Sequence, residues 1–204
     1  MGSRLETRGS KLMRLFVALD LDDAIRVRIS RFLEGVRGFA PEARWVRPES
    51  LHVTLKFIGE TFENDLEKIR LGLETIHANA FDVNLRGHGF FPSPRAPSIF
   101  WIGVKSEALA SLAATVDEKL ALVGIAKEEH AFNPHITLAR GASRAPRRQK
   151  GHDPKMNLRG VQEKLVTRPT PDFGTMTARE FFLYQSQPAP GGSKYTKLAR
   201  FALR

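Results

Sequence analysis

Apolar side chains follow two different periods along this chain of 204 residues, and the change of period separates strand-like from helix-like segments. Short apolar or alternating runs are typical of strands, whereas apolar residues spaced by three and four positions are typical of one helix face. The strand-like runs span residues 15–19, 51–58, 81–85, 99–104, 134–138, 176–186 and 195–201. The helix-like runs span residues 25–36, 64–77, 109–123 and 161–166.

The order strand, helix, loop, strand occurs twice, first over residues 15–58 and again over 99–138, which indicates an internal duplication. Between the copies, glycines and prolines over residues 87–97 predict a bent passage that carries the chain from one half to the other. We therefore expect an α+β fold with two pseudo-symmetric lobes around a central cleft. Each lobe would be an antiparallel-rich sheet with helices on its outer face.

Residues 1–12 are polar and follow neither period, so we expect them to be a disordered leader outside the fold. Residues 13–204 would form a single bilobal domain, because 42% hydrophobic and 26% charged residues are ordinary globular usage.

Cysteine is absent, which excludes a disulfide framework, a thiolate nucleophile and cysteine-ligated zinc. No apolar run approaches the roughly 20 residues that span a bilayer. We expect a cytoplasmic protein with no membrane partner.

The chain is strongly basic, with a formal net charge of +10, of which the first twelve residues contribute two. A basic balance favours a polyanionic partner, although it does not identify one. Cations concentrate between residues 140 and 155, where five of them precede Asp153. Such a run is typical of a solvated, mobile loop, and it can also track a phosphate backbone without folding first. We expect this loop to contribute to affinity for a polymeric phosphate backbone rather than to chemistry.

Two matching segments stand out within the duplicated halves: Leu51-His52-Val53-Thr54-Leu55 and Pro134-His135-Ile136-Thr137-Leu138. In an extended strand, residues two apart share a face, so each histidine lies beside its threonine while the apolar residues anchor the other face. A single histidine on a strand is more often a hydrogen-bonded structural residue. The occurrence of the same pair in both halves favours a shared functional site.

Two imidazoles on either side of one substrate can act as acid and base in a single displacement, because histidine titrates near neutral pH. The hydroxyls of Thr54 and Thr137 can donate hydrogen bonds to the non-bridging oxygens of a phosphate between them. The combination of His52, His135 and the two threonines therefore indicates in-line chemistry on a phosphodiester, without a metal or a covalent intermediate.

Two other kinds of site are less well supported. Two histidines from separate strands could ligate a metal, but the chain has no cysteine and no His-Glu-x-x-His-like frame that would add a carboxylate. A Ser-His-Asp site would need a turn that exposes the nucleophile, and no Gly-x-Ser-x-Gly segment is present. We expect no cofactor.

Arg140 offers a third charge, but its parity in the strand complicates its use. With His135 and Thr137 on one face, Arg140 falls on the opposite face unless the strand bends or bulges after Leu138. Alternatively, Arg140 is an ordinary surface arginine at a strand end. Lys56 has the same parity as His52 and is therefore predicted to point into the cleft more simply.

The two frames, together with the continuation Lys56-Phe57-Ile58-Gly59-Glu60, resemble the paired His-x-Thr motifs of the 2H phosphoesterase superfamily. More narrowly, the chain resembles the RNA 2′,3′-cyclic phosphodiesterases, which are also called 2′-5′ RNA ligases. Phe91-Pro92 and the segments 182–186 and 195–196 are similar to that family as well, so the resemblance extends from about residue 13 to the C-terminus. The basic insert over residues 144–155 matches no motif of the family.

The resemblance implies that His52 and His135 are catalytic, and that Thr54, Thr137 and Arg140 bind phosphate. It implies metal-independent hydrolysis of 2′,3′-cyclic phosphates at RNA 3′ ends or oligonucleotides to 2′-phosphates, with reversible 2′-5′ ligation as a further activity. It also assigns His52 as the acid and His135 as the base, and we expect a monomer. The alternative is a non-catalytic RNA-end or nucleotide-binding module that uses the same cleft.

Overall fold

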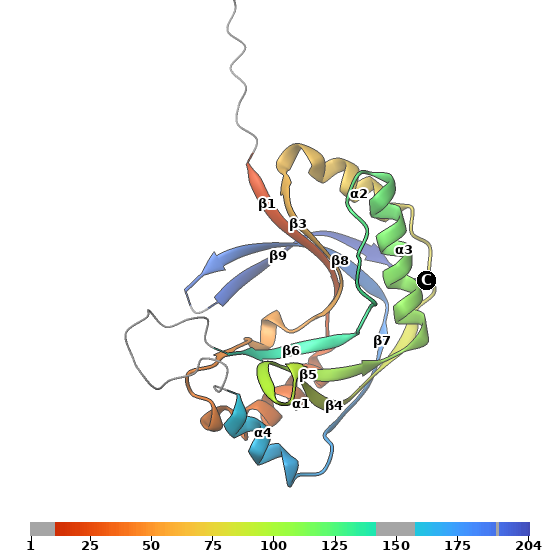
Figure 1. The fold of residues 1–204 in the computed structure, drawn as a ribbon. Coiled ribbons are helices and arrows are strands. Elements are labelled where there is room, and N and C mark those ends of the chain that lie inside the picture. Colours follow the sequence, from red (N-terminus) through yellow and green to blue (C-terminus); the bar gives the residue numbers. More distant parts are fainter. Residues whose placement is uncertain (1–10, 142–157, 191) are drawn as a thin grey trace, which may run out of the picture.

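Two antiparallel sheets with helices packed around them make up the fold (Figure 1), and the expected two-lobed α+β architecture is confirmed. The computed structural model describes residues 11–141, 158–190 and 192–204. The first sheet has the order β3 (Val53–Phe62), β1 (Leu12–Leu19), β8 (Glu180–Ala189), β9 (Gly192–Ala202). The second has the order β2 (Arg44–Trp45), β6 (His135–Arg140), β5 (Ala96–Lys105), β4 (Phe81–Ser93), β7 (Asp172–Ala178). The helices are α1 (Asp23–Glu34), α2 (Leu66–Glu74), α3 (Glu107–Leu122) and α4 (Arg159–Val166).

The same strand pairing occurs in both sheets, as the internal duplication of the sequence predicts. In each sheet the strand that carries or follows the His-x-Thr frame pairs antiparallel with the strand that opens its half, β3 with β1 and β6 with β5. The halves also exchange strands, because β4 from the first half continues the second sheet while β8 and β9 complete the first. Each lobe is therefore built from both halves of the sequence.

Helices cover the sheets with the apolar faces that their periodicity predicts. In α1, Ile25, Ile29 and Leu33 recur every four residues and are buried, and the helix packs against β7. The helices α2 and α3 lie side by side (Figure 1), and α3 contacts both β3 and β4. A continuous apolar core joins residues of both sheets to these helices. The opposite face of the first sheet carries a separate small cluster, formed by Phe16, Ala18, Phe182 and Tyr184.

Several boundaries differ from those expected. The run over residues 176–186 is divided between β7 and β8, because the chain leaves one sheet and enters the other around Arg179. The passage over 87–97 is the end of the β4–β5 hairpin rather than an irregular connection. Strand β1 begins at Leu12, within the segment assigned to a leader, since Leu12 pairs with Phe62. Residues 1–10 lie outside the described residues.

The described helices include none that is both long enough and apolar enough to cross a membrane. The basic run after β6 lies outside the described residues from position 142 to 157, so its expected role in RNA affinity stays a prediction.

Candidate active site

Both motif histidines sit at the start of their strands and are held in the same way. His52 directly precedes β3, and its Nδ1 lies 2.8 Å from the carbonyl oxygen of Ser50. His135 opens β6, and its Nδ1 lies 2.8 Å from the carbonyl oxygen of Asn133. A carbonyl oxygen only accepts, so in each case Nδ1 carries the proton and Nε2 keeps a free lone pair. The two imidazoles therefore have the same tautomer, fixed by the backbone two residues earlier.

All five residues that the sequence nominated line a single cavity of about 250 Å³ between the sheets. Its lining comprises Val46, His52, Thr54, Phe57, Phe91, Ile99, His135, Thr137, Arg140 and Tyr195. Strands far apart in the sequence contribute to it: β3 and β9 from the first sheet, and β4, β5 and β6 from the second. We call this cavity the cleft. It presents two imidazoles, two threonine hydroxyls, the phenol of Tyr195 and one guanidinium to whatever occupies it.

A bulge in β6 explains how Arg140 reaches the cleft. Thr137 pairs with Trp101 and Ala139 with Phe100, so Leu138 is left without a partner in β5. Leu138 and Ala139 are consequently both buried, and the alternation resumes one residue later. Arg140 thus returns to the face of His135 and Thr137, which is the exception that the parity argument allowed.

The first motif strand has a bulge at the corresponding position, and here it removes the predicted lysine from the cleft. Thr54 pairs with Ala18 and Lys56 with Val17, so Leu55 is unpaired. The following residues are shifted by one, and Phe57 rather than Lys56 lines the cleft. The prediction that Lys56 points into the cleft was wrong, because it assumed uninterrupted alternation. Phe57 and Arg140 therefore occupy equivalent positions of the two lobes, each five residues after its histidine.

Lys56 is instead a buried structural residue that ties β3 to α3. Only 4% of it is exposed, and its Nζ forms a salt bridge with Asp117 and donates a hydrogen bond to the carbonyl oxygen of Ala126 at 2.8 Å. Asp117 also accepts a hydrogen bond from the backbone N–H of Glu128 at 3.0 Å. The pair thus fixes the segment between α3 and β6 that leads to the second motif.

Replacing Asp117 with alanine is expected to lower the free energy of unfolding by about 3 kcal/mol, because it leaves the Lys56 ammonium buried without its counterion. Glu163→Ala serves as the matched control, since its ion pair with Arg159 is exposed and should contribute less than about 1 kcal/mol. Urea denaturation of both variants measures the difference. Equal small losses would show that the Lys56 pair contributes no more than a surface pair.

Aromatic rings enclose both histidines, and the sequence assigned none of them a role. The His52 ring lies 4.8 Å from Phe16 and 5.2 Å from Tyr195, the latter edge-on. The His135 ring lies edge-on to Phe91 at 5.1 Å and is 6.4 Å from Trp101. These rings pack against the two imidazoles and restrict their rotation. The sequence signal for them is weak, because an aromatic residue on a strand is more often part of a core.

Gly89 makes room for the ring that supports His135. It pairs with Trp101 across β4 and β5, and a Cβ atom there would lie 2.2 Å from the indole ring. Because real Cβ contacts are never that short, any larger residue at position 89 would displace Trp101. Phe91 stacks on the same indole ring at 5.0 Å. The position of the second histidine is therefore set partly by a glycine on a neighbouring strand.

The environment of the cleft keeps both imidazoles neutral in the free protein. Burial is the main reason that the pKa of His52 is lowered to about 4, and the charges of Arg140 and His135 act in the same direction against the opposing effects of Ser50 and Asp20. Burial also lowers the pKa of His135, again with a contribution from Arg140. Near neutral pH each Nε2 is therefore a free base until an anion enters.

Metal binding gains no support from the arrangement of side chains. Among the described residues, no group of three or more histidine, aspartate and glutamate side chains is placed to hold a metal ion.

Comparison with known proteins places the chain beside phosphoesterases. The family model described as LigT like Phosphoesterase matches residues 19–101 and 102–195, one match for each half. The RNA 2′,3′-cyclic phosphodiesterase of Archaeoglobus fulgidus is 35% identical over 93% of this chain and 99% of that protein. The protein of the same name from Escherichia coli is 32% identical over 95% of this chain and 98% of its own.

Solved structures agree with the sequence relatives. A crystal structure from Thermus thermophilus superposes with a TM-score of 0.76 at 30% identity, covering 94% of this chain and 98% of that one. The crystal structure of Escherichia coli LigT complexed with 3′-AMP superposes with a TM-score of 0.74 at 31% identity, covering 95% and 99%. The similarity therefore extends over both lobes and the cleft between them.

Proposed function

Since the chain belongs to the LigT-like phosphoesterase family of the 2H superfamily, we propose that it opens 2′,3′-cyclic phosphates at RNA 3′ ends without a metal and leaves a 2′-phosphate. As a member of this family, the chain is an enzyme of the cyclic phosphodiesterase class. The observation that carries the proposal is the convergence of His52, His135, Thr54, Thr137 and Arg140 on one cavity. The relatives named RNA 2′,3′-cyclic phosphodiesterase support the choice of substrate.

In the proposed reaction the cyclic phosphate lies between the two imidazoles. Nε2 of His135 takes a proton from a water molecule, whose oxygen attacks phosphorus as the bond to the ribose 3′ oxygen breaks. Nε2 of His52, protonated beforehand, gives its proton to that departing oxygen. The products are a 2′-phosphate and a free 3′-hydroxyl. The next turnover requires His135 to lose the proton it gained and His52 to regain one.

The remaining cleft residues stabilise charge on the phosphate. The hydroxyls of Thr54 and Thr137 would each donate a hydrogen bond to a non-bridging oxygen, where negative charge accumulates during attack. The guanidinium of Arg140 can present two parallel N–H groups to the same oxygens. The bulge at Leu138 and the presence of Arg140 in the lining of the cleft support this role.

The proposed acid must gain its proton together with the substrate. Burial lowers the pKa of His52 to about 4 in the free protein, so near neutral pH it carries no proton to give. A phosphate anion within a few ångströms favours the charged imidazolium and raises the pKa. Binding of the cyclic phosphate would thus charge the acid, which links protonation to the presence of substrate.

Ligation fits the same arrangement. If the 5′-hydroxyl of a second RNA takes the place of water, His135 removes its proton and the product is a 2′-5′ linkage rather than a 2′-phosphate. By microscopic reversibility the same two histidines exchange roles when such a linkage is cleaved back to the cyclic phosphate. Ligation, a cytoplasmic location and a monomeric state stay predictions.

The test is incubation of the protein with a nucleoside 2′,3′-cyclic phosphate in the presence of EDTA. Turnover to the nucleoside 2′-phosphate, followed by chromatography against both isomeric standards, is the expected result. Tight binding without turnover would instead support a non-catalytic nucleotide-binding module. Activity that is lost in EDTA and restored by zinc or manganese would contradict the metal-free mechanism.

A further inference from the structure

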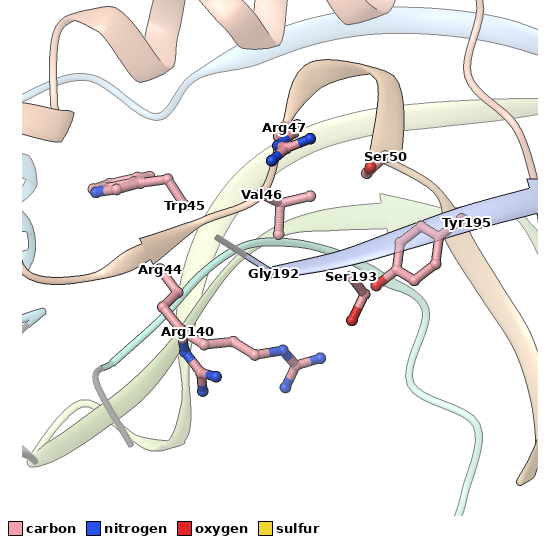
Figure 2. Close-up of a pocket in the computed structure, with 9 residues that line it drawn as sticks. All are labelled: Arg44, Trp45, Val46, Arg47, Ser50, Arg140, Gly192, Ser193 and Tyr195. Atoms are coloured by element: carbon pink, nitrogen blue, oxygen red, sulfur yellow. The ribbon is translucent and has the colours of Figure 1, made fainter. Parts of the chain in front are cut away.

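A second cavity of about 150 Å³ opens beside the cleft, and the proposed reaction does not use it (Figure 2). Its lining comprises Arg44, Trp45, Val46, Arg47, Ser50, Arg140, Gly192, Ser193 and Tyr195. Val46, Arg140 and Tyr195 also line the cleft, so the two cavities adjoin. We call the second cavity the arginine pocket. A ligand that occupies both cavities would need two neighbouring polar groups.

The charge of the arginine pocket is entirely positive. Three of its nine lining residues are arginines and none is acidic. Arg44 and Arg140 are direct partners in the antiparallel pair of β2 and β6, and like charges directly opposite destabilise such a pair. Within the described residues, no salt bridge involves Arg44, Arg47 or Arg140. The pairing of Arg44 with Arg140 is unfavourable by itself and suits an anion bound near their guanidinium groups (Figure 2).

Neighbouring contacts hold the backbone of residues 44–47, the cationic segment, in place. The indole Nε1 of Trp45 donates a hydrogen bond to the carbonyl oxygen of Ala40 at 3.0 Å, and the ring packs edge-on against Phe100. The backbone N–H of Val46 donates to the carbonyl oxygen of Leu138 at 2.8 Å. Since β2 is fixed on both sides of Trp45, little backbone order would have to be gained when an anion binds.

Hydroxyl groups complete the arginine pocket on its other side. Figure 2 shows Ser193 and Tyr195, both on β9, across the pocket from Arg44 and Arg140. One Nη atom of Arg47 donates to the carbonyl oxygen of Pro190 at 2.9 Å, which connects the cationic segment to the end of β8. Guanidinium and hydroxyl donors around one small cavity are the chemistry that recognises a phosphate group.

We propose that the arginine pocket binds the phosphate on the 5′ side of the terminal nucleotide while the cleft holds its cyclic phosphate. This inference rests on the proposed function, since it takes the cyclic phosphate as the group in the cleft. In RNA every nucleotide after the first carries a phosphate on its 5′ oxygen, so a 3′ end with a cyclic phosphate presents two phosphates on one ribose. Arg140 lies where the two sites meet. The preferred substrate is then an RNA end or a 5′-phosphorylated nucleotide rather than a free nucleoside cyclic phosphate.

The smallest test compares a nucleoside 2′,3′-cyclic phosphate with the same compound carrying a 5′-phosphate. The wild-type enzyme should turn over the 5′-phosphorylated compound with a kcat/KM about tenfold higher, mainly through KM, since a charge-assisted hydrogen bond contributes on this scale. The double variant Arg44→Ala, Arg47→Ala should lose that advantage. Its kcat/KM for the compound without a 5′-phosphate should stay that of the wild type, because that compound does not reach the arginine pocket.

Arg86→Ala is the matched control, because Arg86 is an exposed arginine on β4, toward the opposite edge of the same sheet from β2. It should keep the full preference for the 5′-phosphate. A dinucleotide that ends in a cyclic phosphate and has an uncharged methylphosphonate linkage should behave like the compound without a 5′-phosphate. This comparison separates the charge of the group from its size.

The outcomes distinguish this inference from the proposed function. If wild-type enzyme turns over both compounds equally, the arginine pocket does not bind the 5′-phosphate, whereas the proposed function stands. If the double variant loses activity equally on both, Arg44 and Arg47 serve the cyclic phosphate and the inference is wrong. If neither compound is turned over, the proposed function fails, and calorimetry with nucleoside 2′-phosphate and 2′,5′-bisphosphate still tests the pocket. Equal affinities of those two ligands would overturn the inference.

Discussion

Replacement of His135 with alanine is expected to lower kcat on a nucleoside 2′,3′-cyclic phosphate by roughly 10²–10⁴-fold, the usual contribution of one positioned proton transfer. His52→Ala should cause a loss of similar size. KM should change much less, because Thr54, Thr137 and Arg140 still hold the phosphate. Steady-state kinetics measure the effect, and circular dichroism of each variant checks that the fold is intact.

A substrate with a good leaving group separates the roles of the two histidines. A p-nitrophenyl phosphodiester that the cleft accepts needs no acid, so His52→Ala should recover much of its loss there, whereas His135→Ala should stay impaired. The opposite ranking would reverse the assignment of acid and base. Equal loss in both variants on both substrates would show that the imidazoles mainly position the phosphate. The variant that combines His52→Ala and His135→Ala should lose less kcat than the product of the two single losses, because the two imidazoles act in one step.

Arg140→Ala is expected to lower kcat/KM by roughly 10²-fold on the same substrate, because it removes a preorganised donor from the oxygens on which charge develops. Arg140→Lys should recover only part of the loss, since an ammonium keeps the charge but not the paired N–H groups of the guanidinium. Arg86→Ala, which removes an exposed arginine toward the opposite edge of the same sheet, is the control and should leave kcat/KM unchanged. A loss confined to substrates with a 5′-phosphate would place Arg140 in the arginine pocket alone.

The placement of each histidine beside its threonine was predictable, because it depends only on local strand geometry. Two His-x-Thr segments with apolar residues between them put each histidine beside its threonine in any strand, whatever that strand pairs with. The order of elements around them was repeated, so two similar lobes followed, and both were found. Cysteine-based and Gly-x-Ser-x-Gly chemistry could likewise be set aside from residue types alone.

The positions after each frame were not predictable, because a bulge depends on the partner strand. Leu55 and Leu138 look like ordinary inward residues of an alternating pattern, and only the registers with β1 and β5 leave them unpaired. The same shift buried Lys56 and brought Arg140 to the cleft. A rule that follows parity along one strand fails at such a point, since the extra residue shows only in the hydrogen bonds between strands.

By itself, the sequence determined the fold class, the duplication and the two His-x-Thr pairs, since helix and strand periods are properties of consecutive residues. The tertiary structure alone decided which strands complete each sheet, which aromatic rings enclose each histidine, and that Arg44, Arg47 and Arg140 surround one cavity. These features join residues from distant parts of the chain. They depend on strand register and on the exchange of β4 and β8 between lobes. The sequence of one strand does not specify which other strand it pairs with, so these features could not be predicted from local patterns.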